Sequence, residues 1–207
     1  MLIRPLIAML LLAPLALAQE TTPPLFAADT PIIDYQHPQL PDYGRIGMVV
    51  SPEKLAGDIG LDMLKQGGNA VDAAVATGFA LAVTLPRAGN LGGGGFMLVH
   101  LAETDEQIFI DYRETAPAAA SRDMFLNADG TVNKAKAYFS RQAAGVPGTV
   151  AGLVHAQTQY GKLPLATVIQ PAIDLAEQGF DTPLALNMSL TSRADRLGMD
   201  PEAKRIY

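Results

Sequence analysis

The chain has 207 residues and a formal net charge of −6 at pH 7, with 15 lysines and arginines against 21 aspartates and glutamates. This acidic balance argues against a nucleic-acid-binding protein, because binding to phosphates needs clustered lysines and arginines. It also leaves no polybasic patch for an anionic membrane surface. Hydrophobic residues make up 49% of the chain, aromatic residues only 6%, and cysteine is absent. We therefore expect one sizeable core, or part of a larger one, made of small aliphatic side chains without disulfides.

The first 18 residues are typical of a secretory signal peptide. Arg4 provides the basic region, residues 6–15 the apolar region, and residues 16–18 the small-residue cleavage site. A membrane anchor fits less well, because spanning a bilayer takes roughly 20 apolar residues. We expect the mature chain to begin at Gln19 and the protein to be periplasmic or secreted.

The proline-rich residues 19–43 predict an extended lead-in rather than a domain, so that the folded domain covers residues 44–207. Residues 47–50 are a strand candidate. Ser51 and Pro52 then fit the N-cap and the first position of a helix, which the glycine pair 67–68 ends.

A second helix is predicted over residues 70–84. Asn69 is its N-cap, and Asp72 lies three residues later, where a carboxylate meets free backbone amides. The segment is small and apolar around nearly its whole circumference, which predicts a helix that is buried on all sides.

Residues 96–101 and 107–112 read as two strands joined by the polar link 103–106, which predicts an antiparallel hairpin. The first strand is almost continuously apolar, so we expect helices on both faces of its sheet and His100 as a core residue.

The second half of the chain is mainly helical by pattern. Residues 127–130 predict a turn, and Pro147-Gly148 opens a helix that Gly161 ends. Residues 165–178 are helical again, with Pro171 either kinking this helix or starting another, and the tail 181–207 is also helical. The order of elements predicts an α+β layered fold with helices packed on a central sheet.

Two features could bind a substrate. The glycines 92–95 follow a helix and enter a strand, whereas a phosphate-binding loop follows a strand and opens a helix, so this function is excluded. The glycines either let a substrate approach the backbone closely or form a purely structural turn. Arg113 stands at the end of the second strand, where a guanidinium can hold a carboxylate through two parallel hydrogen bonds. On spacing alone, the sequence fits an ion pair of Arg113 with Asp111, Glu114 or Asp123 as well as it fits substrate binding.

The residue pattern offers no metal site and no nucleophile. The histidines 37, 100 and 155 are isolated, and the serines 51, 121, 140 and 189 lack the context of a nucleophile elbow. We expect neither a metal nor another cofactor.

Five segments in order resemble the γ-glutamyltransferase (glutathione hydrolase) family. They are GGNAVDAA (67–74), GGGGF (92–96), DYRETAP (111–117), VPGTVAG (146–152) and PAIDLAEQGF (171–180). The resemblance implies an α+β fold of the N-terminal-nucleophile hydrolase type, an αββα layered sandwich of which this chain holds the N-terminal part.

The resemblance also implies a chemistry. A proenzyme cuts itself into two subunits, and the new N-terminal threonine of the small subunit attacks the γ-glutamyl amide of glutathione or a related compound, with its own α-amine as base. The γ-glutamyl group then passes to water or to an amino acid. The arginine of the family's Asp-x-Arg-Glu motif holds the α-carboxylate of the substrate, and this role maps onto Arg113.

The sequence departs from the family pattern at its end, because Tyr207 falls inside the large subunit and the threonine motif is not reached. We therefore expect no catalytic residue here, an inactive fragment when alone, and the C-terminal small subunit as partner. The alternatives are a cephalosporin or glutaryl acylase of the same fold, a poly-γ-glutamate-processing enzyme, or a non-catalytic binding remnant.

Overall fold

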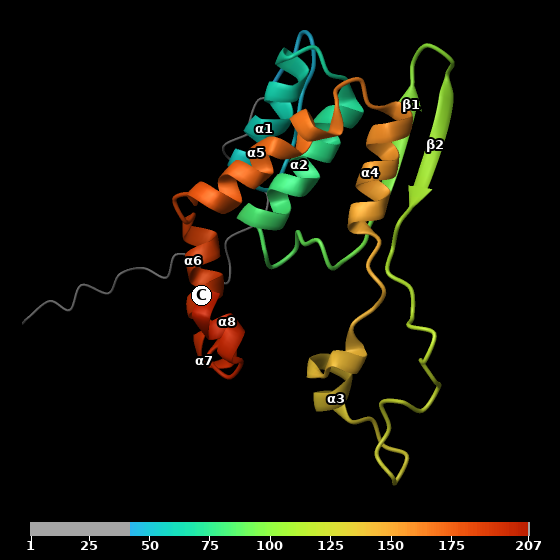
Figure 1. Ribbon diagram of the computed structural model, residues 1–207, viewed down its shortest axis with the longest axis vertical. Helices are drawn as coiled ribbons and strands as arrows, with labels where there is room; N and C mark the ends of the chain where they lie inside the picture. The colour runs from blue at the N-terminus through green and yellow to red at the C-terminus, as the bar shows by residue number, and fades with distance from the viewer. Residues whose placement is uncertain (1–41, 207) are drawn as a thin grey trace, which may run out of the picture. The chain divides into compact units, whose positions relative to one another are not determined.

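The computed structural model describes residues 42–206 (Figure 1). The predicted signal peptide, nearly all of the lead-in, and His37 lie outside these residues.

The apolar helix predicted after Asn69 is the centre of the fold. Helix α2 (Ala70–Thr84) is surrounded by α1 (Lys54–Lys65), α4 (Thr149–Tyr160) and α5 (Leu165–Gln178), all of which pack against it. The predicted cap is confirmed, because the Asn69 side chain accepts from the backbone N–H of Asp72 and the Asp72 carboxylate accepts from that of Asn69. Burial on all sides is confirmed except along one stripe, where Ala70 and Ala74 are exposed.

The predicted hairpin is confirmed as β1 (Phe96–Leu101) and β2 (Glu106–Asp111), an antiparallel pair in which Val99 lies opposite Ile108. Because side chains alternate along a strand, Val99 (7% exposed) packs on the helical core, whereas Leu98 (72%) and Phe109 (63%) point away from it.

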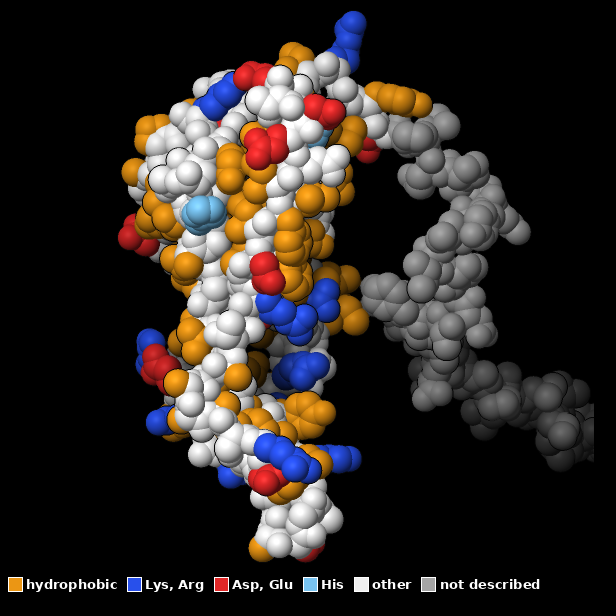
Figure 2. Space-filling model, turned by 90° about the vertical axis from the view of Figure 1, so that its right-hand side faces the viewer, with side chains coloured by type: hydrophobic (Ala, Val, Ile, Leu, Met, Phe, Trp, Pro, Cys, Tyr) orange, Lys and Arg blue, Asp and Glu red, His pale blue; other side chains and the backbone are white. Residues whose placement is uncertain are grey.

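The expected burial of both sheet faces is wrong for the described residues. Helices cover one face, and His100 is exposed on the other, because it shares the alternation of Phe96 and Leu98 rather than that of Val99. Figure 2 looks onto the side of the molecule that carries the hairpin and shows hydrophobic side chains gathered over its upper half.

Three local predictions differ in detail from the structure. Residues 47–50 have no regular secondary structure and pair with no strand among residues 42–206. Helix α1 begins at Lys54, and its N-cap is Glu53, whose carboxylate accepts from the backbone N–H groups of Leu55 and Ala56. Of the two alternatives for Pro171, the start of a second helix is wrong, since α5 runs through this residue.

The remaining elements lie outside this core. The predicted turn at 127–130 is confirmed, with the N–H of Gly130 donating to the Asn127 carbonyl at 3.0 Å. The other elements are the short helices α3 (Lys134–Phe139), η1 (Arg141–Ala143), α6 (Leu184–Thr191), α7 (Ala194–Leu197) and α8 (Pro201–Ile206). Within residues 42–206, no helix is long and apolar enough to cross a membrane.

Candidate substrate-binding site

Arg113 lies two residues after the end of β2, and hydrogen bonds between the two chain segments of the hairpin continue up to its neighbour Tyr112. The ladder extends by one residue pair, because Tyr112 N–H donates to the Gly95 carbonyl at 3.1 Å and Gly95 N–H donates to the Tyr112 carbonyl at 3.4 Å. Asp111 accepts from the backbone N–H of Arg113 at 3.0 Å.

The guanidinium of Arg113 is exposed and forms no ion pair within residues 42–206. Of the three carboxylates that could have paired with it, Asp123 lies near Arg122 instead, at 3.7 Å. Asp111 and Glu114 form no ion pair within the same residues. None of the carboxylates of residues 42–206 therefore competes with a ligand for this side chain.

The glycine run lies against the backbone of this arginine. A Cβ at Gly94 would stand 2.6 Å from the Tyr112 carbonyl oxygen and 2.8 Å from the Arg113 Cα. Contacts this short do not occur in folded proteins, so only glycine fits where the two segments cross. A close backbone approach, rather than a phosphate cradle, explains this part of the run.

The N-terminus of α4 fixes the other side of the glycine run. The Gly93 carbonyl accepts from the backbone N–H groups of Gly148 and Thr149 at 2.8 and 3.0 Å. The ring of Tyr112 packs against Gly95 and Gly152, and its burial raises the pKa of the phenol. Tyr112 was not among the residues expected in the site, although its position next to Arg113 was a usable signal.

Two neighbouring glycines provide a matched test of this packing. Gly94→Ala is expected to destabilise the chain by about 1–3 kcal/mol, because the new methyl group meets rigid backbone. Gly92→Ala is the control, since a Cβ there meets nothing within 4 Å, and its effect should stay within about 0.5 kcal/mol. Urea unfolding of both variants measures the difference, and equal stabilities would show that the crossing is not tight.

A second polar cluster, which the sequence predicted only as a helix cap, forms around Asp72. Its buried carboxylate accepts from the Gln157 amide at 2.6 Å and from the backbone N–H groups of Asn69, Lys162 and Leu163 at 2.6 to 3.1 Å. We call this set the Asp72 cluster. It ties the start of α2 to the end of α4 and to the loop that follows, and thereby orients the helix that holds Gly93.

Burial by itself raises the pKa of Asp72, because it penalises the charged form. The hydrogen bonds from Gln157 and from the three backbone N–H groups outweigh that effect together, so the pKa of Asp72 lies below its ordinary value. The carboxylate is therefore ionised at neutral pH without any cation beside it.

Metal chemistry has no visible basis among residues 42–206, where no group of three or more histidine, aspartate, glutamate or cysteine side chains could hold an ion. His155 stacks edge-on against Tyr160 rather than facing a carboxylate, with the ring centroids 6.5 Å apart.

Comparison with known proteins places this geometry in a family. The family described as gamma-glutamyltranspeptidase matches residues 56–207, which include every segment of the site. The chain belongs to the gamma-glutamyltranspeptidase family.

The relatives of this gamma-glutamyltranspeptidase chain include glutathione hydrolase proenzymes and solved gamma-glutamyltranspeptidase structures. It is 55% identical over 134 residues to the glutathione hydrolase proenzyme of Escherichia coli, a match that covers 65% of this chain and 23% of that protein. The crystal structure of Helicobacter pylori gamma-glutamyltranspeptidase superposes with a TM-score of 0.77 at 42% identity, covering 80% of this chain and 47% of that one. A cephalosporin acylase from Bacillus halodurans gives a TM-score of 0.64 at 31% identity, covering 84% and 32%.

These likenesses confirm the predicted α+β fold of the N-terminal-nucleophile hydrolase type. The chain spans between 23% and 31% of the length of the first curated relatives it matches.

Proposed function

We propose that this chain is the N-terminal part of an exported γ-glutamyl acyl-transfer proenzyme. In this proposal, Arg113 holds the α-carboxylate of glutathione or another γ-glutamyl compound, and no metal or cofactor takes part. The nucleophilic threonine comes from the C-terminal small subunit, and its hydroxyl oxygen bonds to the γ-carbonyl carbon as the amine leaves. Water or an amino acid then takes the γ-glutamyl group from the threonine ester.

The exposed guanidinium of Arg113 is the observation that carries the substrate assignment. It combines a cation that has no ion-pair partner among residues 42–206 with a backbone fixed by β1, by Gly94 and by the start of α4. Because a guanidinium is a rigid planar fork, a side chain loses less freedom per hydrogen bond when it binds a carboxylate through two such bonds than a lysine does.

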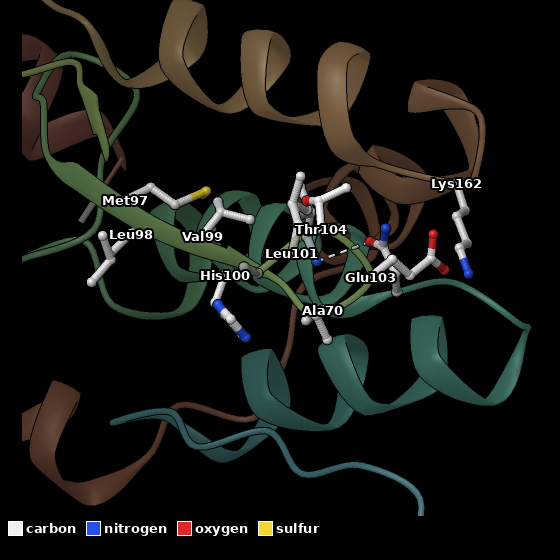
Figure 3. Close-up of a pocket in the computed structure, with 13 residues that line it drawn as sticks. Ala70, Met97, Leu98, Val99, His100, Leu101, Glu103, Thr104 and Lys162 are labelled. Atoms are coloured by element: carbon white, nitrogen blue, oxygen red, sulfur yellow. Dashed lines mark hydrogen bonds between the residues drawn. The ribbon is translucent and has the colours of Figure 1, made fainter. Parts of the chain in front are cut away.

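Two cavities beside α2 support the proposal that a second subunit completes the fold. One, of about 400 Å³, runs along β1 on the side away from β2 and has Ala70 and Ala74 in its wall (Figure 3). The other, of about 650 Å³, lies between α2 and residues 46–50, and it shares those two alanines. The exposed stripe of α2 thus lies between residues 46–50 and β1, whose edge away from β2 has no strand partner among residues 42–206, so a further strand would find backbone partners there.

The decisive experiment compares this chain alone with a precursor in which the remaining polypeptide follows Tyr207. We expect no turnover by the chain alone. The precursor should split into two subunits and cleave a chromogenic γ-glutamyl anilide in preference to a glutaryl amide.

Each alternative has its own outcome in this assay. Preference for the glutaryl amide would indicate an acylase, as in the relative named acylase ACY 1 proenzyme of Pseudomonas sp., which is 38% identical over 176 residues. Preference for poly-γ-glutamate would indicate a polymer-processing enzyme. Glutamate binding without turnover of any of these substrates would indicate a binding remnant.

A further inference from the structure

A small cavity between the end of α2 and the helices α6 and α7 has two arginines in its wall. It has a volume of about 280 Å³, and Arg87, Arg193 and Ser189 are its polar lining residues. Leu186, Leu190 and Leu197 provide an apolar floor, and Leu186 is 7% exposed. None of these residues belongs to the site around Arg113.

Tight backbone turns fix the main chain at both arginines. Arg87 lies in the turn after α2, where the backbone N–H groups of Ala88 and Gly89 both donate to the Leu85 carbonyl, at 3.0 and 2.8 Å. Arg193 lies between α6 and α7, where its own N–H donates to the Leu190 carbonyl at 3.0 Å and its carbonyl accepts from Leu197 N–H at 2.9 Å. The two cations are therefore presented from fixed backbone rather than from a long loop.

Neither guanidinium has a carboxylate partner in the described part of the chain. The ion pairs within residues 42–206 are Lys54–Asp58, Lys65–Asp62, Arg122–Asp123 and Arg205–Glu202. Both arginines are exposed, so each keeps N–H donors free for a ligand, and among residues 42–206 neither forms an ion pair although acidic side chains are abundant in this chain. An anion in the cavity would give both cations a partner of opposite charge.

We propose that this cavity binds a small organic anion, with a carboxylate or phosphate group between Arg87 and Arg193 and a short aliphatic part on the three leucines. Guanidinium groups suit both kinds of anion, because their planar N–H donors match two oxygens at once. The volume lies near the lower limit of ligand pockets, roughly 300 Å³, which favours a ligand of few atoms over a nucleotide. This inference does not depend on the proposed enzymatic activity.

The test is a titration of the full chain, labelled with ¹⁵N-arginine, in which the Nε–H resonances are followed at mildly acidic pH and constant ionic strength. The probes are inorganic phosphate and hexanoate, which separate a phosphate site from an aliphatic carboxylate site. We expect saturable shifts of the Arg87 and Arg193 resonances with at least one probe. Arg87→Gln and Arg193→Gln should each weaken that binding about ten- to a hundredfold, as the loss of one charge-assisted hydrogen bond predicts.

Two controls make the outcome specific. Arg122→Gln removes an exposed arginine outside the cavity and should leave the affinity unchanged. Arg113→Gln should also leave it unchanged, which separates this site from the proposed substrate site. Absence of saturation would overturn the proposal. So would an affinity in Arg87→Gln and Arg193→Gln that equals the affinity of the natural chain. So would loss of binding in Arg113→Gln alone.

Discussion

Replacing Arg113 with alanine is expected to raise the KM of the complete protein for a γ-glutamyl donor by about ten- to a hundredfold for each hydrogen bond lost. The factor follows from the roughly 1.5–3 kcal/mol that a charge-assisted hydrogen bond contributes. Arg113→Lys should restore only part of the affinity, because one ammonium group cannot form the paired hydrogen bonds of a guanidinium. Steady-state kinetics with the γ-glutamyl anilide measures both changes.

The exposure of Arg113 makes this experiment easy to interpret. Because its side chain forms no ion pair within the described residues, Arg113→Ala should change the free energy of unfolding by less than about 0.5 kcal/mol. Arg122→Ala is the matched control, since it removes another exposed arginine from the same segment. An unchanged KM in Arg113→Ala, or an equal rise in both variants, would remove Arg113 from the substrate site.

The sequence predicted this site well where local patterns determine the structure. Residue spacing over short stretches of sequence predicts the cap at Asn69, the hairpin and the position of Arg113 at a strand end. The choice between a substrate clamp and an ion pair did not, because it depends on which carboxylates the fold brings near Arg113. The glycine run was likewise ambiguous until Gly94 could be seen against the Arg113 backbone.

Two errors in the sequence-based predictions have a common physical origin. His100 was expected in the core and residues 47–50 in a strand, because an almost continuously apolar strand and a short apolar segment before a helix are typical of a complete sheet. Within residues 42–206, β1 has one strand neighbour and one covered face. Both patterns therefore indicate neighbouring strands and helices that residues 42–206 do not provide. This agrees with the proposal of a second subunit.

The Asp72 cluster could not be predicted from the sequence for a different reason. The cap residue Asp72 is visible in the sequence, but its partners Gln157, Lys162 and Leu163 follow 85 to 91 residues later. No local pattern connects positions so far apart. The cluster is nevertheless expected to dominate the response of this chain to mutation and to acid.

Asp72→Asn is expected to destabilise the fold by about 2–3 kcal/mol at neutral pH, although it changes the side chain by one atom. Each carboxylate oxygen is met only by donors, so an amide NH₂ in either orientation faces N–H groups. At least one charge-assisted hydrogen bond is lost, worth about 1.5–3 kcal/mol. Asp72→Ala should cost at least about 3 kcal/mol, because three backbone N–H groups lose an acceptor at about 1–3 kcal/mol each.

The pH dependence of stability separates this cause from simple misfit. Because the pKa of Asp72 is lower in the folded chain than in the unfolded one, its contribution is complete above the unfolded value of about 3.9. That contribution is lost as the pH falls through the lower, folded value. The stability difference between the natural chain and Asp72→Asn should therefore be largest at neutral pH and shrink below about pH 4.

Urea unfolding at neutral and acidic pH measures this change, with Asp62→Asn as the control. Asp62 is an exposed helical aspartate whose carboxylate lies 2.7 Å from the Lys65 ammonium, so its replacement should cost no more than about 1 kcal/mol. A difference between Asp72→Asn and the natural chain that stays constant with pH would mean that shape, rather than charge, explains the loss. In that case the ionised Asp72 carboxylate would not be what joins α2 to α4, and the support that α4 gives to Gly93 and Arg113 would need another source.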